Sequence, residues 1–403
     1  MRVLIADKFE KVGIDGLKEI GCEVESQPDL SADTLPGALE RIDPQILIVR
    51  STKVTAAALK SAASLSLVIR AGAGVDNIDM PTASGLGIFV ANCPGKNSIA
   101  VAELVMGLLL SADRRIPDQV AELRAGQWSK GEYSKARGLH GRTIGIVGLG
   151  QIGREILVRA RAFGMHAVAW SRSLTHAEAE RLGVAYAETP VEVAHRSDVV
   201  TINVAANGET KRMVNAEFLA AMHPGSYLIN TSRGSVVDEE ALLEAIRTKG
   251  IRAGLDVYDG EPGGSKAEFR SVLAAAPGVY GTHHIGASTD QAQVAIAHEV
   301  IRIVQEFLAN GTVPNCVNRL ARSSATHVLA VRHHNRPGVL AHVFRVLADG
   351  SINVEEVENI IYHGATATLA RIHLDGRPAP EDLAAIRSGN PHIISVELTE
   401  VDK

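Results

Sequence analysis

The sequence predicts an α/β protein whose main part has parallel sheets and whose C-terminal part is a smaller, separate unit. Short apolar runs without a polar face recur along the main part, and helix-like segments lie between them. Strands of this composition are typical of parallel sheets that helices cover on both faces. After a polar linker at 318–327 the expected order of elements changes to βαββαβ, which is typical of a ferredoxin-like domain.

Composition and charge narrow the class of protein. The chain has 41 Lys and Arg against 46 Asp and Glu, so its net charge of −5 indicates neither a nucleic-acid nor a membrane partner. Cys22, Cys93 and Cys316 are far apart in the sequence, which predicts no disulfide framework and no metal site. We expect a cytoplasmic protein, because a reducing compartment fits such cysteines and the N-terminus is charged too early for a signal peptide.

A glycine-rich turn between an expected strand and an expected helix is the most informative motif. Residues 144–147 form an apolar run, and Gly148, Gly150 and Gly153 follow in the spacing G-x-G-x-x-G. In this context the glycines permit a tight turn, the close approach of a diphosphate, and close packing of helix on strand. Free N–H groups at the helix start would meet the diphosphate. The motif predicts a dinucleotide site, and the alternative is a glycine-rich turn without a ligand.

The tip of the next strand, 166–170, bears on the choice of dinucleotide. An acidic residue about twenty positions into the motif would bind the adenosine ribose of NAD. Ser171 and Arg172 stand there instead, and their hydroxyl and guanidinium groups suit the 2′-phosphate of NADP. The alternative is that Arg172 stacks on adenine from a solvated loop while NAD binds. The predicted cofactor is NAD or NADP, and Ser171-Arg172 favours NADP.

Three polar residues follow expected strands later in the main part. A six-stranded sheet would be completed by strands at 198–203, 227–230, 253–257 and 279–282. Arg233, Glu261 and His284 come after three of these strands. A histidine can carry a proton near neutral pH, a carboxylate can hold its tautomer, and a guanidinium can clamp a substrate carboxylate. Taken singly, each could instead be structural: a surface cation, a turn residue and a core histidine.

The segments around these residues resemble a known family. NTSRGSVVDEEAL (230–242), LDVYDGEP (255–262) and THHIGAST (282–289) are similar to active-site segments of the D-isomer-specific 2-hydroxyacid dehydrogenases. The resemblance implies that His284 is the acid/base, Glu261 its partner and Arg233 the substrate clamp. It also implies further cofactor contacts by Gln151, Ile152, Ser232 and Asp256.

The same resemblance implies an architecture of two similar Rossmann-like or flavodoxin-like lobes. A discontinuous substrate-binding lobe would comprise residues 1–92 and 284–318, and a dinucleotide-binding lobe would comprise 93–283. In the first lobe, strands are expected at 3–6, 46–49, 67–69 and 88–90. The remainder, 326–403, resembles an ACT domain, a regulatory module of several amino-acid enzymes.

Two turns of the first lobe resemble those of the phosphoglycerate-oxidising branch of the family. They are VRSTKVT at 49–55 and RAGAGVDNID at 70–79, and each follows an expected strand, where α/β sheets bind ligands. The resemblance implies that Arg50, Ser51 and Lys53 face a phosphate and that backbone donors of Ala73 and Gly74 face a carboxylate. The glycine-containing turn could otherwise be an ordinary strand–helix connection.

The C-terminal part carries a turn that is similar to an effector-binding motif. In His333-His334-Asn335-Arg336-Pro337-Gly338 and on the following strand, the residues His333, Asn335 and Asn353 fall on the ligand positions of that motif. The resemblance implies an amino-acid effector, L-serine, bound between two such domains. The alternative is a domain that only dimerises. Either way the family implies a homodimer or homotetramer.

The sequence leaves three functions open. NAD(P)-dependent oxidation of D-3-phosphoglycerate to 3-phosphohydroxypyruvate, the first step of L-serine biosynthesis, is favoured by Arg50, Lys53 and the ACT-like part. NADPH-dependent reduction of glyoxylate or hydroxypyruvate is favoured by Ser171-Arg172. A dinucleotide-sensing protein without turnover is the third, and the joint presence of Arg233, Glu261 and His284 argues against it.

Overall fold

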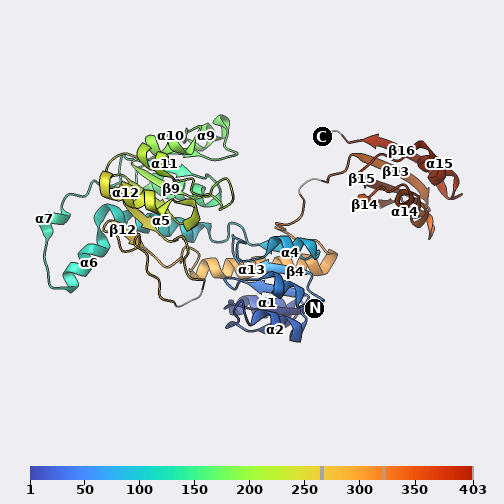
Figure 1. Cartoon of the computed structure of the whole chain (residues 1–403), viewed down its shortest axis with the longest axis horizontal. Coiled ribbons are helices and arrows are strands. Elements are labelled where there is room, and N and C mark those ends of the chain that lie inside the picture. Colours follow the sequence, from blue (N-terminus) through green and yellow to red (C-terminus); the bar gives the residue numbers. More distant parts are fainter. Residues whose placement is uncertain (264–266, 321–322, 402–403) are drawn as a thin grey trace. The chain divides into compact units, whose positions relative to one another are not determined.

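The structure is a computed structural model that describes residues 1–263, 267–320 and 323–401. The chain forms two compact units, Met1–Asn318 and Arg319–Lys403 (Figure 1). The break between them falls inside the predicted polar linker. The larger unit contains two parallel sheets, and the smaller unit contains an antiparallel one.

The first sheet of the larger unit has five parallel strands in the order β2-β1-β3-β4-β5. They are β1 (Arg2–Ile5), β2 (Glu23–Ser26), β3 (Ile46–Val49), β4 (Leu67–Arg70) and β5 (Phe89–Asn92). The four predicted strands are present, and β2 is additional. The sequence does not reveal β2 because this edge strand is mostly polar and has no buried residue among its four described ones.

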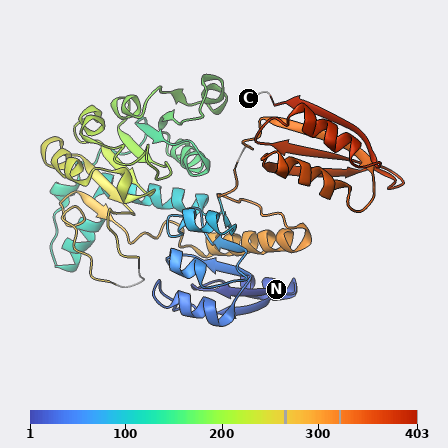
Figure 2. The same ribbon diagram turned by 45° about the vertical axis from the view of Figure 1, so that its right-hand side comes forward.

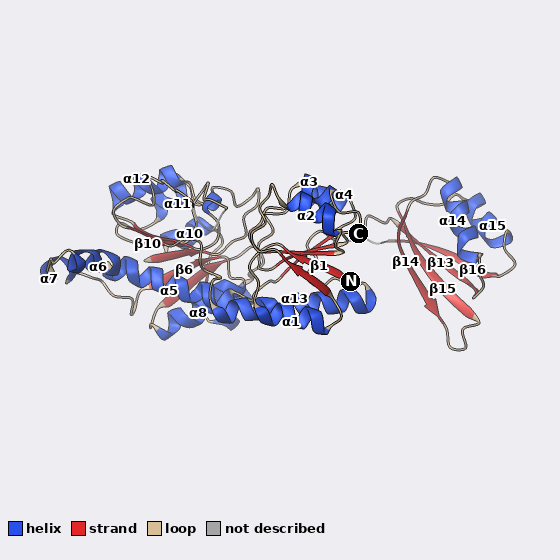
Figure 3. Ribbon diagram, turned by 90° about the horizontal axis from the view of Figure 1, so that it is seen from below, coloured by secondary structure: helices blue, strands red, loops and turns tan. Residues whose placement is uncertain are grey.

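Helices cover both faces of this sheet. One face carries α2 (Leu35–Ile42), α3 (Ala56–Lys60) and α4 (Met80–Gly85). The other carries α1 (Lys11–Glu19) and α13 (Asp290–Asn310), which pack on each other although they are distant in sequence (Figures 2 and 3). The side chain of Thr289 caps α13, and Gly311 ends it in the left-handed conformation. This helix brings the chain back from the second sheet to the first.

The second sheet has seven parallel strands in the order β12-β11-β10-β9-β6-β7-β8. They are β6 (Thr143–Val147), β7 (His166–Trp170), β8 (Ala185–Tyr186), β9 (Val199–Ile202), β10 (Tyr227–Asn230), β11 (Arg252–Leu255) and β12 (Val279–Gly281). The prediction of six strands is wrong by one, because it lacks β8. This edge strand of two residues, neither of them buried, is too short to leave an apolar run in the sequence.

Helices also cover both faces of the second sheet (Figure 3). One face carries α5 (Ser98–Arg114), α8 (Gln151–Ala162) and α9 (His176–Leu182), and the other carries α10 (Pro190–His195), α11 (Ala216–Ala221) and α12 (Glu239–Lys249). α8 buries Ile156, Leu157 and Ala160 at the apolar spacing that predicts it. Gly164, just past its end, has φ 69°, which glycine adopts without strain. In the described ranges no helix is long and apolar enough to cross a membrane.

Two short helices form an arm that extends from the end of α5. They are α6 (Ile116–Arg124) and α7 (Lys130–Tyr133), at the end of the larger unit in Figure 1. Every residue of both helices is at least partly exposed. Trp128, which lies between them, is 80% exposed, so the arm holds a large apolar side chain in solvent in the single chain.

The smaller unit is a four-stranded antiparallel sheet in the order β14-β15-β13-β16. In chain order its elements are β13 (His327–His334), α14 (Val339–Asp349), β14 (Val354–Ile361), β15 (Ala367–Leu374), α15 (Pro380–Ser388) and β16 (Ile393–Glu400). This order confirms the predicted βαββαβ pattern. Alternate residues of β13 are buried, namely Leu329, Val331 and His333. Leu329 and Val331 belong to one apolar core together with residues of α14 and α15.

Candidate active site

The three predicted catalytic residues follow three strands that are neighbours in the second sheet. Arg233 comes after β10, Glu261 after β11 and His284 after β12. Because the strands are parallel, their carboxyl ends lie at one edge of the sheet, where α/β proteins bind ligands. The glycine-rich turn after β6 opens at the same edge, with only β9 between β6 and β10.

His284 and Glu261 form a hydrogen-bonded pair. Nδ1 of His284 contacts Oε1 of Glu261, and the N–H of Tyr258 donates to Oε2 at 3.0 Å. Burial opposes the charge of Glu261, but the hydrogen bonds from His284 and Tyr258 and the charge of Arg233 hold its pKa below the ordinary value. The histidine side chain is 44% exposed, so its other ring nitrogen can reach a substrate. The pair can therefore exchange a proton with a bound hydroxyl group.

Asp256 positions the histidine. Its carboxylate, on a residue only 1% exposed, accepts hydrogen bonds from the Thr282 hydroxyl and from the N–H groups of Ile285 and Gly286, all at 2.7–2.8 Å. Its carbonyl accepts from the N–H of His284, which has the uncommon φ of 53°. These four bonds offset the strain of a left-handed non-glycine residue. Asp256 thus supports the turn, and its cofactor contact stays a prediction.

Arg233 pairs with a carboxylate that the sequence does not single out. Its Nε and Nη2 donate to the two carboxylate oxygens of Asp76 at 3.1 and 3.0 Å, and its Nη1 donates to the carbonyl of Ser232 at 2.7 Å. Gly74 lies beneath the guanidinium, since a Cβ there would lie 2.0 Å from Nη2. Asp76 and Gly74 belong to the turn after β4, so the first lobe reaches the substrate clamp.

The turn after β3 holds the residues predicted to face a phosphate. Asp7 fixes this turn, because its carboxylate accepts from the N–H groups of Arg50, Ser51 and Thr52. The hydroxyl of Ser51 also donates to Asp7, at 2.8 Å, so Ser51 supports the turn and has no donor left for a phosphate in this arrangement. Arg50 reaches the hydroxyl of Ser288 at 3.3 Å, and Lys53 is exposed.

The turn after β4 presents backbone donors. Among the described residues the N–H groups of Ala73 and Gly74 donate no backbone hydrogen bond, and their predicted contact with a carboxylate stays a prediction. The turn is anchored at the carbonyl of Ala73, which accepts from Asn92 at 2.6 Å. Arg70, which begins this turn, was not predicted as a site residue. Burial, and then the nearby charge of Arg233, lowers the pKa of Arg70 to about 10.

The glycine-rich turn fits a dinucleotide. A Cβ at Gly148 would lie 2.7 Å from the carbonyl of Asn203, and one at Gly153 would lie 2.4 Å from the carbonyl of Gly148. A Cβ at Gly150 would meet nothing described within 4 Å, so this side is open to a ligand. Gly150 precedes α8 without a side-chain cap, which leaves the N–H groups at Gln151 and Ile152 for an anion.

The residues predicted to contact the rest of the cofactor differ in whether their side chains already have a hydrogen-bonding or ionic partner within the chain. The hydroxyl of Ser232 donates to Asn230 at 2.8 Å, whereas Ser171 lies at the end of β7 and is partly exposed. The side chain of Arg172 is 82% exposed and lies 3.7 Å from the carboxylate of Glu209, a pair that sequence reasoning did not identify. In the described part of the chain no three His, Cys, Asp or Glu side chains are grouped as metal ligands would be.

The predicted effector residues do not meet within one chain. Asn335 lies at one end of β15, where its N–H donates to the carbonyl of Thr366, and Asn353 lies at the other end, where its N–H donates to Asp375. The strand between them places these ends roughly 30 Å apart at about 3.4 Å per residue. An effector that contacts both residues therefore needs two copies of the unit.

His333, the third predicted effector residue, is buried within the single chain, and its role toward an effector stays a prediction. It is 2% exposed, its Nδ1 contacts the carbonyl of His334 at 2.8 Å, and its Nε2 contacts the hydroxyl of Thr368 at 3.3 Å. Thr368 in turn donates to Asn359. In the single chain His333 is a buried residue of the sheet, and both ring nitrogens already have partners.

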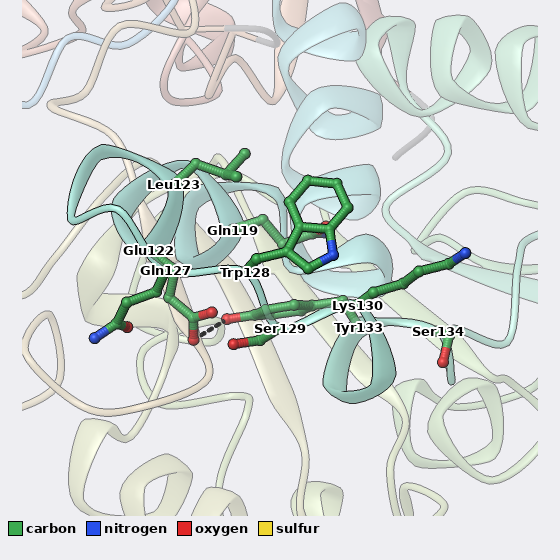
Figure 4. Close-up of a pocket in the computed structure, with 9 residues that line it drawn as sticks. All are labelled: Gln119, Glu122, Leu123, Gln127, Trp128, Ser129, Lys130, Tyr133 and Ser134. Atoms are coloured by element: carbon green, nitrogen blue, oxygen red, sulfur yellow. Dashed lines mark hydrogen bonds between the residues drawn. The ribbon is translucent and has the colours of Figure 1, made fainter.

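A pocket outside this site lies on the arm (Figure 4). Trp128 and Tyr133 line it, and the hydroxyl of Tyr133 donates to Glu122 at 2.7 Å. Arg115, which begins the arm, bonds to Asp118 and Glu132 and lies over the ring of Tyr133. The arm is thus internally braced, and its pocket is separate from the residues that follow the strand ends.

Comparisons with known proteins agree with this geometry. Residues 106–286 match the family described as D-isomer specific 2-hydroxyacid dehydrogenase, NAD binding domain. The chain is 35% identical to a D-3-phosphoglycerate dehydrogenase of Methanocaldococcus jannaschii over 98% of this chain and 74% of that protein. It is 38% identical to a hydroxypyruvate reductase of Thermotoga maritima over 68% of this chain and 87% of that protein.

A solved structure shows the same fold for the larger part of the chain. It is an NADPH-dependent glyoxylate/hydroxypyruvate reductase from Sinorhizobium meliloti in complex with NADP and malonate, 29% identical with a TM-score of 0.66. The match covers 78% of this chain and 96% of that one. Of several other curated relatives, the chain spans 56–59% of their length.

The chain belongs to the D-isomer specific 2-hydroxyacid dehydrogenase family. It is an oxidoreductase that acts on a CH–OH group with a nicotinamide dinucleotide as its cofactor. The residues of the glycine-rich turn and the pair of His284 and Glu261 have the chemistry that this reaction needs.

Proposed function

We propose that the chain oxidises D-3-phosphoglycerate to 3-phosphohydroxypyruvate, the first step of L-serine biosynthesis. The observation that carries the proposal is the concentration of arginines from both lobes beside the histidine. Arg50 contacts Ser288 just after the His284 turn, and the charges of Arg50 and Arg233 both act on Arg70. A substrate with a carboxylate at one end and a phosphate at the other suits such a set of guanidinium groups. The M. jannaschii relative, a D-3-phosphoglycerate dehydrogenase, supports it.

The residues of this site divide the reaction between them. Arg233 and the N–H groups of Ala73 and Gly74 hold the carboxylate, which fixes the C2 hydroxyl near His284. The free ring nitrogen of His284 takes the proton of that hydroxyl as the hydride leaves C2, and Glu261 stabilises the imidazolium that forms. The dinucleotide, when bound, supplies the hydride acceptor. In the reverse direction His284 returns the proton to the new alkoxide oxygen.

The division into lobes follows from this assignment. Residues 1–92 and 284–318 would bind the phosphate and part of the carboxylate, and residues 93–283 would bind the dinucleotide. Arg50, Lys53 and the additional Arg70 supply positive charge at the phosphate end. Ser51 would act indirectly, by holding the turn through Asp7.

A second candidate function is the reduction of glyoxylate or hydroxypyruvate with NADPH. Ser171 and Arg172 at the end of β7 favour it, because they offer donors where an acidic residue would select NAD. The T. maritima relative and the S. meliloti structure bear reductase names, and the latter contains NADP. For this chain, use of NADP is part of the proposal.

Steady-state rates test the proposed function. D-3-phosphoglycerate with NAD and with NADP is compared with glyoxylate and hydroxypyruvate in the presence of NADH and NADPH. We expect the highest kcat/KM for the phosphorylated pair, measured in both directions. A higher value for glyoxylate than for 3-phosphohydroxypyruvate, with NADPH preferred, would assign the reductase function instead.

We further propose that the active protein is a homodimer or homotetramer with L-serine as an effector. The arm supports contact with a second copy, because Ile116, Val120, Leu123 and Trp128 are all exposed on it, and several exposed apolar side chains on one segment are typical of an interface. Asn335 and Asn353, at opposite ends of the sheet, fit an effector that is held between two copies of the smaller unit. The test is a chain truncated after Asn318. If this truncation changes only the oligomeric state and does not affect inhibition by serine, the smaller unit serves only for dimerisation.

A further inference from the structure

Asp76 holds the substrate clamp from the other lobe. It lies in the turn after β4, while Arg233 lies 157 residues later, after β10. Both oxygens of its carboxylate accept from Arg233, at 3.1 Å from Nε and 3.0 Å from Nη2. Such a two-point contact fixes the plane of a guanidinium as well as its distance. No catalytic role assigned above involves Asp76.

The contact uses one edge of the guanidinium and leaves another free. Asp76 takes the edge formed by Nε and Nη2, and the carbonyl of Ser232 takes one N–H of Nη1. A guanidinium has five N–H groups, so one on Nη1 and one on Nη2 remain. The second two-point edge of a guanidinium is formed by one N–H of Nη1 and one N–H of Nη2, and Asp76 does not occupy this edge.

The positive charges around Asp76 favour its ionised form. Burial disfavours its charge, but the hydrogen bonds and charge of Arg233 and the charge of Arg70 hold its pKa below the ordinary value. Asp76 forms an ion pair with Arg233 at 3.0 Å, and its negative charge also acts on Arg70, where it opposes the effect of Arg233. Without it, the repulsion between Arg70 and Arg233 would no longer be offset by the charge of Asp76.

We propose that Asp76 is a positioning residue: it fixes Arg233 by the Nε–Nη2 edge and turns the Nη1–Nη2 edge toward the substrate carboxylate. The proposal rests on the assignment of Arg233 as the clamp. Because Asp76 and Arg233 come from the two lobes, the clamp is set only when the turn after β4 lies against the turn after β10. The rival account is that Asp76 occupies the place of the substrate carboxylate and competes with it.

The test is the variant Asp76→Asn in the full-length protein, with Asp79→Asn as the matched control. Asp79 lies three residues later and caps α4 through the N–H of Thr82, so Asp79→Asn removes the same charge from the same segment without touching Arg233. We measure kcat and KM for D-3-phosphoglycerate and for glyoxylate, and the Kd of oxalate with cofactor present. Oxalate and glyoxylate carry no phosphate, so they report on the clamp alone.

Positioning predicts that Asp76→Asn raises the KM of both substrates and the Kd of oxalate by about 10- to 100-fold, the worth of a charge-assisted contact. The kcat should fall less, and Asp79→Asn should change neither constant by more than about twofold, as expected for a residue whose partner is Thr82 and not Arg233. A lower KM and tighter oxalate binding in Asp76→Asn would establish competition and overturn the proposal. Equal effects of the two variants would show a merely structural role and overturn it too.

The proposed function and the role of Asp76 can fail separately. Wild-type protein that reduces glyoxylate but does not oxidise D-3-phosphoglycerate refutes the proposed substrate, while the glyoxylate and oxalate measurements still decide on Asp76. Wild-type protein that neither turns over glyoxylate nor binds oxalate refutes the clamp role of Arg233, and the role of Asp76 with it.

Discussion

The active site and the predicted effector site differ in how the chain assembles them. Arg233, Glu261 and His284 follow neighbouring parallel strands, so a single chain brings them together. Asn335 and Asn353 lie at opposite ends of an antiparallel sheet, so a single chain keeps them apart. The predicted catalytic residues thus all lie in one larger unit, whereas effector binding at both asparagines would require a pair of smaller units.

The topology of each sheet explains the difference. In a parallel sheet all carboxyl ends lie at one edge, and the residues after them converge without further design. In the smaller unit β13 and β14 both pair antiparallel with β15, so they run in the same direction, and α14 connects them. The residue that follows β13 and the residue that precedes β14 therefore lie at opposite ends of the sheet. Symmetric association can then bring the two ends of different copies together.

The largest expected effect tests the single-chain side of this comparison. His284→Ala should lower turnover about 10²- to 10⁴-fold, the usual contribution of a positioned acid/base, with little change in cofactor affinity. His283→Ala is the matched control, since this neighbour is exposed and the Glu261 partner belongs to His284. Steady-state kinetics with a cofactor titration measures both. Near-normal turnover in His284→Ala would rule out the proposed mechanism.

A second prediction concerns the link between the lobes. Glu299 of α13 is 6% exposed and contacts Lys96, Arg302 and Asn315. These contacts lower the pKa of Glu299 to about 2, and the hydrogen bond from Arg302 has the largest effect. From an ordinary value near 4.3, this shift corresponds to roughly 3 kcal/mol of stability. We expect Glu299→Gln to cost about that much at pH 7.

The sign of the pH dependence follows from the direction of the shift. A lowered pKa stabilises the folded state above the unfolded value, and the contribution is lost as the pH falls from about 4.3 toward 2. The difference in unfolding free energy between wild type and Glu299→Gln, measured in urea, should therefore shrink between pH 5 and pH 3. A difference that is the same at both pH values would mean that packing, not charge, accounts for the loss.

A third prediction concerns the cofactor. If Arg172 binds the 2′-phosphate, Arg172→Ala should raise the KM for NADP by about 5- to 150-fold, corresponding to 1–3 kcal/mol, and leave the KM for NAD nearly unchanged. Arg181→Ala is a suitable control, because this side chain is 70% exposed on the same lobe and pairs with Glu178. Equal rises for NAD and NADP would favour an arginine that stacks on adenine.

The smallest expected effect tests the two-chain side of the comparison. Inhibition by L-serine should correspond to a coupling of about 1–3 kcal/mol, and either Asn335→Ala or Asn353→Ala should abolish it without changing the uninhibited rate. Calorimetry with serine on the full-length protein measures binding directly. If no small amino acid binds the wild type, the smaller unit is an assembly element.

Mixed subunits make this prediction sharper. Dimers that combine one Asn335→Ala chain with one Asn353→Ala chain, purified by two different tags, contain one site with both asparagines intact. They should bind about half of the wild-type amount of serine, as two-fold symmetry requires. Mixed dimers that bind none would show that both residues of a site come from one chain, against the arrangement of the sheet.

Local sequence patterns predict much of the fold and of the site. The apolar runs locate most strands of the two parallel sheets, and the strand–turn–helix context of Gly148, Gly150 and Gly153 locates the dinucleotide turn. Two strands escape this approach. β2 is a largely polar edge strand, and β8 has only two residues, so neither leaves an apolar run.

The parts of the site that sequence patterns miss are contacts between distant segments. Asp7 fixes the turn at Arg50 from 43 residues away, and Asp76 reaches Arg233 across 157 residues. Periodicity and motif spacing describe neighbours in sequence, so they carry no information on such pairs. His333 is different, because its two-residue alternation with Leu329 and Val331 along β13 is a local signal that points to one buried face.

Transfer of a label tests the central claim most directly, namely that the site removes hydride from C2 of a 2-hydroxy acid. D-3-phosphoglycerate deuterated at C2 is incubated with the full-length protein and NAD or NADP, and the nicotinamide is examined by NMR. The account predicts deuterium at C4 of the nicotinamide ring in wild type, formed far more slowly in His284→Ala. Consumption of the substrate without label in the nicotinamide, or no consumption with either cofactor, would contradict it.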